Sequence, residues 1–417
     1  MTHAAASAAP TLSRALLALL TVLLVALMTS ITAVGVITGL IIAVSLLRLT
    51  DGTLRARDRA PLAWPLLAFA ATTLLSALVA GHPGPALWES KHLLGIALFL
   101  AAVNGFRDGD DVRRALRWLY LAVAVVSVHA FVQVWACGIA VPLPDVVSWA
   151  LRLKLEACRA SPLFRAKGFF SIYMTLGGSL LISLALIVAS LAVGARWRLA
   201  LHAVTGTLAV AALALTYVRS AWLGLGAAVL VVSGFTRRHL LLLGLVLAAT
   251  IALSIPSPLR QRALSIVDPA DPTARERIYF WEAGARMLRD APLLGMGPGG
   301  VKRHYPEYRD PAARRPTTGH LHNNAVQIAA ERGVLGLAAW LAIWIAFFVQ
   351  AGRIYARLPA TRVDDRALVA GSLAAVAGFF VAGLFEYNFG DSEVINLLWV
   401  VMAFPFVVDP RHAAASY

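Results

Sequence analysis

The chain of 417 residues is 59% hydrophobic and only 14% charged, a composition that excludes an ordinary soluble domain. A net charge of +15 would indicate nucleic-acid binding in a soluble protein, but in a membrane protein the cations must first be divided between the two membrane faces. We therefore expect an integral membrane protein that contacts membrane lipids and no nucleic acid.

Long apolar runs separated by short charged clusters predict about twelve membrane-spanning helices, since one span needs about 20 residues. In chain order we expect them at residues 15–30, 32–48, 62–80, 91–104, 115–136, 172–193, 199–216, 220–234, 239–255, 324–351, 367–385 and 392–408. The expected fold is a single all-α polytopic membrane domain over residues 1–417.

The distribution of basic residues predicts the orientation of these spans. If the N-terminus is cytoplasmic, one set of short loops holds nearly all their arginines, among them Arg55 and Arg113, while the opposite set holds only Lys91 and Arg219. The positive-inside rule then places both termini in the cytoplasm. A cleaved signal peptide in the first apolar run is the alternative, but its removal would invert every later loop against this charge distribution.

Two long segments, 137–171 and 256–323, are expected outside the membrane, and both are net basic. Arginine forks match phosphate oxygens, so a basic vestibule suits a phosphate-bearing substrate, although contact with anionic lipid headgroups would account for the same charge. The first segment also holds the chain's two cysteines, Cys137 and Cys158, which form a disulfide in an oxidising compartment if their geometry permits.

Arg219 is the only charged residue between Arg198 and Arg237 and lies at the outer junction of two predicted spans. A lone arginine at a membrane boundary is costly unless it has a partner or a task. It is either an anchor that extends to the interface beside Trp222, or a guanidinium held at the depth of a lipid-linked phosphate.

Residues 275–290 have the period of an amphipathic helix on or near the membrane surface. The apolar side of this helix is expected to hold Ile278, Trp281, Ala285 and Leu288. Arg277 falls inside the apolar arc, against the amphipathic pattern, whereas Arg286 and Arg289 are expected to face solvent.

A cation aimed into the protein, as Arg277 is expected to be, must find an anion. Glu331 and Glu386 are the structural candidates, and a substrate diphosphate is the functional one. The glycine-rich segment 291–300 that ends the helix could cradle phosphate through backbone amides, but it lacks the lysine and serine of a nucleotide-binding loop.

Polar residues lead directly into the tenth predicted span, where Asn323 or Asn324 is expected to be the N-cap. His322 then lies beside the positive end of the helix dipole, which disfavours a charged imidazole, and a neutral imidazole suits a general base. The alternative is a histidine that caps the helix or bonds a headgroup, and this applies more strongly to His320.

The span that follows is longer than a membrane crossing needs. Gly333 and Gly336 are expected to mark a kink or a close helix approach. Glu331 and Arg332 would then be buried as a structural charge pair.

These residues carry a resemblance to a known family. HisAsn at 322 and 323, nine further residues, and GlyValLeuGly at 333–336 resemble the His[AsnSerGln]x9GlyxxGly signature of bacterial O-antigen ligases. The motif follows a long external loop, an ArgSerAlaTrp span junction and an ArgIleTyrPheTrp helix that are similar to those of the family. The likeness covers the topology of nearly the whole chain, with motif detail from Arg165 to Gly336.

The resemblance implies a GT-C-like glycosyltransferase of the bacterial inner membrane that needs no cofactor. It would transfer polysaccharide from undecaprenyl diphosphate-linked O-antigen to a sugar hydroxyl of the lipid A-core at the periplasmic face, where 256–323 forms the large loop between the ninth and tenth spans. Carried over, Arg219 and Arg277 hold the diphosphate and His322 is the essential histidine. Additional candidates are His320, Arg165, Lys167 and Arg289.

No metal ligand is expected, because no external Asp and His cluster has the spacing of a metal site. The arginines would then neutralise the leaving diphosphate.

Related activities share this signature region. O-antigen polymerases and oligosaccharyltransferases that glycosylate pilins use the same donor with other acceptors, and the glycine spacing and the lack of an extra soluble domain favour the ligase. An anion transporter, with Arg219, Arg277 and Glu331 along its path, is the alternative from another class, and it would be supported by inverted repeats that the sequence does not display.

Overall fold

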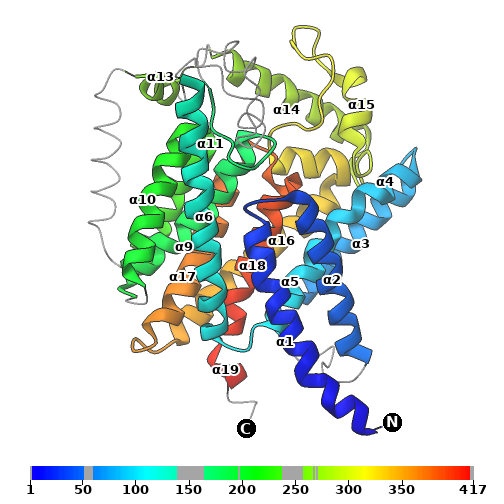
Figure 1. The fold of residues 1–417 in the computed structure, drawn as a ribbon. Helices are drawn as coiled ribbons and strands as arrows, with labels where there is room; N and C mark the ends of the chain where they lie inside the picture. The colour runs from blue at the N-terminus through cyan, green and yellow to red at the C-terminus, as the bar shows by residue number, and fades with distance from the viewer. Residues whose placement is uncertain are drawn as a thin grey trace.

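The computed structural model describes residues 2–50, 60–138, 164–195, 198–236, 257–265, 268 and 271–413. Within these ranges the regular secondary structure is entirely helical, and the helices form one bundle (Figure 1). The all-α polytopic fold expected from the sequence is therefore confirmed.

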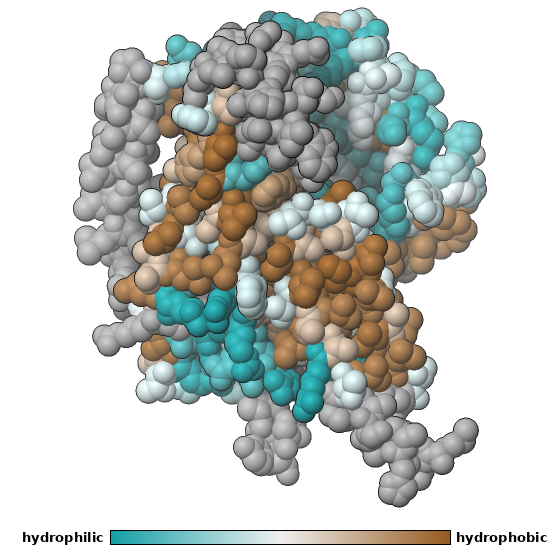
Figure 2. All heavy atoms as spheres, in the orientation of Figure 1, coloured by the Kyte–Doolittle hydropathy of each residue, from teal (hydrophilic) through white to brown (hydrophobic). Residues whose placement is uncertain are grey.

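Within the described ranges, eight helices are long and apolar enough to cross a membrane, and three shorter apolar helices accompany them. They are α1 (Thr2–Ala26), α2 (Ile31–Thr50), α3 (Ala63–Val79), α4 (Pro83–Glu89) continued by η1 (Ser90–Leu93) and α5 (Leu94–Gly105), α6 (Gly109–Gly138), α9 (Tyr173–Val193), α10 (Leu199–Thr216), α11 (Arg219–Thr236), α16 (Asn324–Arg357), α17 (Val363–Ala382) and α18 (Ser392–Val407). Each expected span corresponds to one of these except 239–255, which lies outside the described residues. Figure 2 shows the result as a hydrophobic surface band between two hydrophilic ends.

Close packing of small residues holds the centre of the bundle together. Most residues of α9 and α17 are buried, and α11 packs against both. A Cβ atom built on Gly224 of α11 would lie 2.6 Å from the carbonyl oxygen of Gly378 in α17, so these backbones meet directly. Such contact suits helices in lipid, where apolar side chains gain little by leaving the bilayer for one another.

Four further elements complete the described chain. They are α13 (Pro258–Leu264), α14 (Pro272–Asp290), α15 (Gly300–Tyr308) and α19 (Pro410–Ala413), with a short η2 (Asn388–Gly390) before α18. In Figure 1, α13, α14 and α15 lie at one end of the bundle and both chain termini lie near the other. The predicted topology requires this arrangement, since it places both termini on one side and the loop 256–323 on the opposite side.

Cys137, at the end of α6, is disulfide-bonded. Cys158, the chain's other cysteine, lies outside the described residues. We expect intact-mass analysis after alkylation without reductant to show no alkylated thiol, and after reduction to show two, because an oxidising compartment preserves such a bond. Two alkylated thiols without reductant would contradict this expectation.

Candidate active site

Two asparagines at the start of α16 connect this helix to the segment that follows α17. Asn323 is the N-cap: its side chain accepts a hydrogen bond from the Val326 amide (3.0 Å), and its own amide group donates to the Leu384 carbonyl (2.9 Å). Asn324 donates to the Asn388 side chain (2.6 Å). Asn324 and Asn388 are 64 positions apart in the chain, so their hydrogen bond holds two distant segments together. One segment contains His322 and the other contains Glu386.

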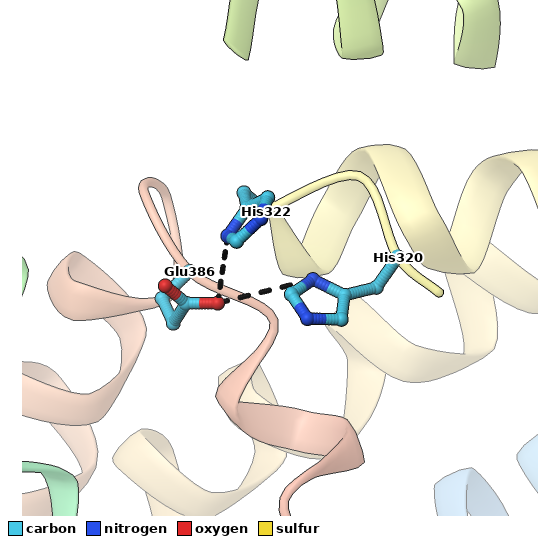
Figure 3. A group of neighbouring side chains, drawn as sticks. All are labelled: His320, His322 and Glu386. Atoms are coloured by element: carbon cyan, nitrogen blue, oxygen red, sulfur yellow. Dashed lines mark hydrogen bonds and ion pairs between the residues drawn. The ribbon is translucent and has the colours of Figure 1, made fainter. Parts of the chain in front are cut away.

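His322, just before this cap, adopts a left-handed backbone conformation with φ 51°. Such a conformation costs a non-glycine residue about 1–3 kcal/mol and persists where neighbouring groups hold it. Its ring stacks on Phe280 of α14, with centroids 5.5 Å apart and planes at 22°, and its Nδ1 lies 2.9 Å from Oε1 of Glu386 (Figure 3). The ring is thus fixed between α14 and the segment after α17.

Glu386 is the functional residue that sequence reasoning missed, having considered it only as an ion-pair partner for Arg277. Burial by itself would raise the pKa of Glu386, but the hydrogen bond and the charge of His322, with further effects from His320 and Arg277, outweigh burial and leave the pKa below its usual value. A neutral His322 that donates Nδ1–H to this carboxylate has its lone pair on Nε2, where a base is needed. A glutamate directly after an apolar span was the available sequence signal.

His320 lies beside this pair without joining its hydrogen bond. Its ring centroid is 4.2 Å from that of His322, and its Nδ1 is 3.8 Å from the Glu386 carboxylate, too far for a hydrogen bond. Burial, followed by the charge of His322, lowers the pKa of His320 to about 4, so this imidazole is neutral near pH 7. Of the two histidines, His322 has the geometry of the base.

His320, His322 and Glu386 form a cluster of possible metal ligands, which the sequence did not predict. One ligand atom each from His320, His322 and Glu386 lie within 4.8 Å of one another, an arrangement that could hold a metal ion. Sequence spacing did not reveal it because Glu386 is 64 residues from His322. The hydrogen bond between His322 and Glu386 already satisfies two of the three groups, so metal independence stays our prediction.

We expect purified protein to keep its activity in excess EDTA, because arginines can neutralise a leaving diphosphate without a divalent ion. The measurement is turnover with EDTA, and again after adding magnesium or zinc. Activity lost in EDTA and restored by either metal would contradict the prediction and point to the histidine and glutamate cluster as the metal site.

Arg277 lines a cavity of about 240 Å³ together with Arg219 and the apolar side chains of Leu223, Ile278 and Trp281. Among the described residues, no oxygen accepts a hydrogen bond from its guanidinium. Burial lowers the pKa of Arg277, which the charge of Glu386 partly opposes, but an arginine remains cationic. The cavity therefore presents a partly desolvated cation that lacks a protein partner within the described part of the chain.

Arg219 lines the same cavity, but its guanidinium already makes hydrogen bonds within the protein. Its guanidinium donates to the carbonyl and hydroxyl of Ser265 (2.5 and 2.8 Å), to Asp271 (3.3 Å) and to the Thr273 hydroxyl (3.1 Å). It therefore ties the start of α11 to the junction of α13 and α14. The family resemblance assigns the two arginines the same role, but they differ in this protein. Arg219 is hydrogen-bonded to residues of the α13–α14 junction, whereas the Arg277 guanidinium has no hydrogen-bond partner among the described residues.

Two more arginines lie near Arg219. Burial, then the charges of Arg219 and Arg165, lower the pKa of Arg262 in α13 to about 10, and the Arg165 guanidinium lies 4.7 Å from the Tyr173 ring centroid. Arg262, which sequence reasoning did not select, and Arg165 thus extend the positive field around the cavity.

The remaining sequence candidates lie elsewhere. The backbone amide of Lys167 donates to the Gln133 side chain (3.3 Å), and Lys167 does not line the cavity. Arg289 is exposed at the end of α14, about 18 Å along the helix axis from Arg277. The structure brings neither to His322.

The buried face of α14 differs from the expected one. It consists of Glu276, Phe280, Ala283, Gly284 and Met287, while Ile278 is 50% exposed. Arg286, expected in solvent, donates through Nε to the Tyr308 carbonyl (3.0 Å). The prediction was wrong because the chain after α14 packs back on this helix, where Glu276 accepts the backbone amides of Arg314 and Arg315.

The two motif glycines of α16 have separate structural reasons. At Gly333 (φ 65°, ψ −170°) the helix is kinked, and the Val334 amide donates to the Pro292 carbonyl (2.8 Å). A Cβ atom on Gly333 would overlap the backbone of Leu293, and one on Gly336 would overlap the Arg332 side chain. The predicted kink is confirmed, and the glycine-rich turn braces it.

The expected charge pair at this kink is also confirmed. Arg332 NH1 lies 3.0 Å from Glu331 Oε2, both side chains are buried, and Arg332 Nε also donates to the Thr73 hydroxyl (3.2 Å). Glu331 is therefore not available as the anion for Arg277.

We expect Gly333→Ala to lower thermal stability, because the backbone conformation alone costs about 1–3 kcal/mol for a residue with a Cβ atom. Gly352→Ala is the matched control, since this glycine lies in the same helix and a Cβ atom built on it would have nothing within 4 Å. The measurement is the unfolding temperature in detergent. Equal temperatures for the two variants would contradict the role assigned to the kink.

Part of the chain is similar to known proteins. Residues 204–341, which include Arg219, Arg277 and His322, match a family model described as O-antigen ligase. The chain is also similar to provisionally named polysaccharide ligases of Rickettsia prowazekii (26% identity over 147 residues, 33% of this chain and 34% of the relative) and Rickettsia conorii (25% over 177 residues, 41% and 40%). The chain thus spans between a third and two fifths of the length of these relatives.

Proposed function

We propose that this chain, which matches a family model described as O-antigen ligase over residues 204–341, transfers a polysaccharide from undecaprenyl diphosphate to a sugar hydroxyl of the lipid A-core. The likeness to polysaccharide ligases supports glycosyl transfer as the class of reaction, and the donor and the acceptor are the finer part of the proposal. One observation carries it. A cavity holds an arginine, Arg277, that has no hydrogen-bond partner among the described residues, and nearby a carboxylate, Glu386, orients the His322 ring.

The arginine cavity suits the two chemical parts of a lipid diphosphate. The Arg277 guanidinium can donate two parallel hydrogen bonds to the oxygens of a phosphate, and Arg165 and Arg262 add positive charge nearby. Leu223 and Ile278, which are 36% and 50% exposed, line the same cavity and offer an apolar surface to the prenyl chain.

The reaction follows as one displacement. The acceptor hydroxyl gives its proton to Nε2 of His322 as its oxygen bonds to the anomeric carbon, and the bond from that carbon to the diphosphate oxygen breaks. Glu386 stabilises the imidazolium that forms, and Arg277 stabilises the negative charge that develops on the leaving diphosphate. A single displacement inverts the anomeric configuration.

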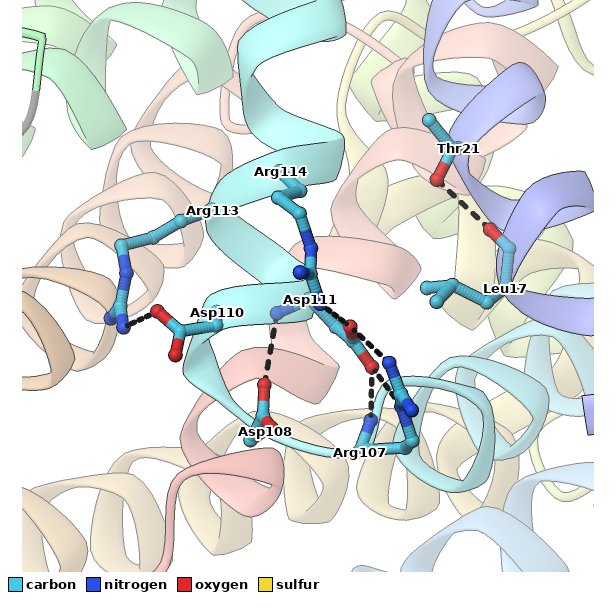
Figure 4. A network of polar contacts seen from close by, with 8 residues as sticks. All are labelled: Leu17, Thr21, Arg107, Asp108, Asp110, Asp111, Arg113 and Arg114. Atoms are coloured by element: carbon cyan, nitrogen blue, oxygen red, sulfur yellow. Dashed lines mark hydrogen bonds and ion pairs between the residues drawn. The ribbon is translucent and has the colours of Figure 1, made fainter. Parts of the chain in front are cut away.

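The proposed orientation places both termini in the cytoplasm and the site at the periplasmic face of the inner membrane. Its support is the group of arginines at the junction of α5 and α6, Arg107, Arg113, Arg114 and Arg117, which lies at the termini's end of the bundle (Figure 1). This junction is also internally paired: buried Asp111 accepts from Arg107 (2.7 Å) and Arg114, and Arg113 reaches Asp365 of α17 (3.0 Å) (Figure 4).

The test is transfer by purified protein in nanodiscs, with radiolabelled polysaccharide on undecaprenyl diphosphate and no transmembrane gradient. Label that moves to the lipid A-core supports the proposal. Label that moves only to another glycan chain, or only to a pilin, would instead indicate a polymerase or an oligosaccharyltransferase. Donor movement across the bilayer without any transfer would indicate a transporter.

A further inference from the structure

The side chains that converge around His322 have the chemistry of a zinc site. His320 and His322 each offer a ring nitrogen and Glu386 offers a carboxylate oxygen, and these three atoms lie within 4.8 Å of one another (Figure 3). Two imidazoles and one carboxylate are a ligand set that zinc takes in proteins, whereas magnesium and calcium take oxygen ligands. Among divalent ions, the cluster therefore favours a transition metal of the zinc type.

The distances within the cluster are close to those around a coordinated ion. Oε1 of Glu386 lies 2.9 Å from Nδ1 of His322 and 3.8 Å from Nδ1 of His320. Ligand atoms bound to a tetrahedral zinc ion at about 2.0–2.1 Å lie about 3.3 Å from one another, which falls between these two distances. Changes of about half an ångström in each contact would therefore fit the ion.

His320 supplies a ligand atom that has no other role among the described residues. Its Nδ1 is buried and makes no hydrogen bond within the described part of the chain, while the side chain as a whole is 35% exposed. The Thr318 hydroxyl holds the backbone of His320, since it donates to the carbonyl (2.8 Å) and accepts from the amide (3.3 Å). A buried nitrogen without a partner is costly, and a metal ion would satisfy it.

A bound ion would change the chemistry of His322. Without a metal, Nδ1–H of His322 faces the Glu386 carboxylate at 2.9 Å, and the lone pair is on Nε2. A metal bound to Nδ1 takes the lone pair of that nitrogen, so the imidazole proton moves from Nδ1 to Nε2 and the ring stays neutral. Nε2 can then accept no proton from a hydroxyl, and Glu386 binds the ion in place of the ring.

We propose that His320, His322 and Glu386 bind one divalent ion of the zinc type, and that the bound ion inhibits transfer. The metal site rests on the geometry of the cluster, whereas the inhibition also rests on the proposed function, in which His322 is the base. The protein would then need no metal for its activity and would lose that activity when zinc fills the cluster.

Metal titration tests the site without requiring turnover. The sample is the full chain in nanodiscs, without an affinity tag and stripped of metal. Calorimetry measures the affinity for zinc chloride, and the visible absorption of cobalt(II) reports tetrahedral coordination. His320→Ala should weaken zinc binding at least about tenfold, because even the loss of a group that only supports a metal ligand costs about 10–100-fold.

His304→Ala is the matched control for this titration. Nδ1 of His304 lies 3.4 Å from Glu307, so this variant also removes a histidine beside a glutamate, but outside the cluster. Its zinc affinity should equal that of the wild-type protein. Equal affinities of the wild-type protein and His320→Ala would overturn the inference.

Transfer gives a second readout, in which each protein is compared with its own rate in EDTA. Zinc should inhibit the wild-type protein and His304→Ala as the site fills, and His320→Ala should need at least about tenfold more zinc. Site-specific binding that leaves transfer unchanged, or a rate that zinc raises, would overturn the inference. Site-specific binding without any wild-type transfer would support the metal site and overturn the proposed function.

Discussion

His322→Ala should leave donor binding near normal while transfer falls by about a hundredfold to ten-thousandfold, the usual cost of losing a general base. The ring contacts Glu386 and Phe280 and is not among the residues that line the arginine cavity, so its removal should not weaken the grip on the diphosphate. The two measurements are equilibrium binding of undecaprenyl diphosphate donor and single-turnover transfer.

The control is His320→Ala, which should retain most activity, since His320 makes no hydrogen bond to Glu386. Donor binding that falls in proportion to turnover would make His322 a substrate ligand instead. An inactive His320→Ala variant beside an active His322→Ala variant would reverse the assignment of the two histidines.

A variant of Glu386 tests whether this carboxylate acts on the His322 ring during transfer. Glu386→Gln keeps the shape but removes the charge that stabilises the imidazolium formed during transfer, so the plateau rate should fall while donor binding stays near normal. Glu386→Asp should restore part of the rate. A plateau rate equal to that of the wild-type protein would contradict a role for the Glu386 carboxylate in transfer.

Arg277→Ala should abolish transfer and weaken donor binding, because the guanidinium has no partner among the described residues and is poised for an anion. Loss of a desolvated charged contact typically costs about 2–5 kcal/mol, or roughly thirtyfold to several-thousandfold. Arg277→Lys should also fail, since an ammonium group lacks the paired donors of the guanidinium fork.

Arg275→Ala is the matched control, an exposed arginine on the same helix that does not line the cavity. Arg286 is unsuitable because it holds the Tyr308 carbonyl. Arg219→Ala should lower the unfolding temperature as well as activity, since it releases Ser265 and Asp271, whereas Arg277→Ala should change activity alone. Equal, mild losses for Arg277→Ala and Arg275→Ala would contradict the diphosphate role.

The sequence alone was sufficient for the spans within the described residues, for a cap at Asn323 or Asn324, for the Gly333 kink and for the buried pair of Glu331 and Arg332. The physical reason is that these features depend on residues close together in the chain. In lipid each backbone amide must be satisfied within its own helix, so an apolar run of sufficient length predicts a span. Caps and glycine kinks also depend on a few neighbouring residues.

Only the tertiary structure decided which polar groups meet. Glu386 approaches His322 because Asn323 and Asn324 connect α16 to the segment after α17, and no local pattern specifies that contact. The buried face of α14 was likewise set by the returning loop at Arg314 and Arg315. Arg219 and Arg277 have the same side chain, yet among the described residues the Arg219 guanidinium makes four hydrogen bonds and the Arg277 guanidinium makes none, because a hydrogen bond depends on where an acceptor lies in space.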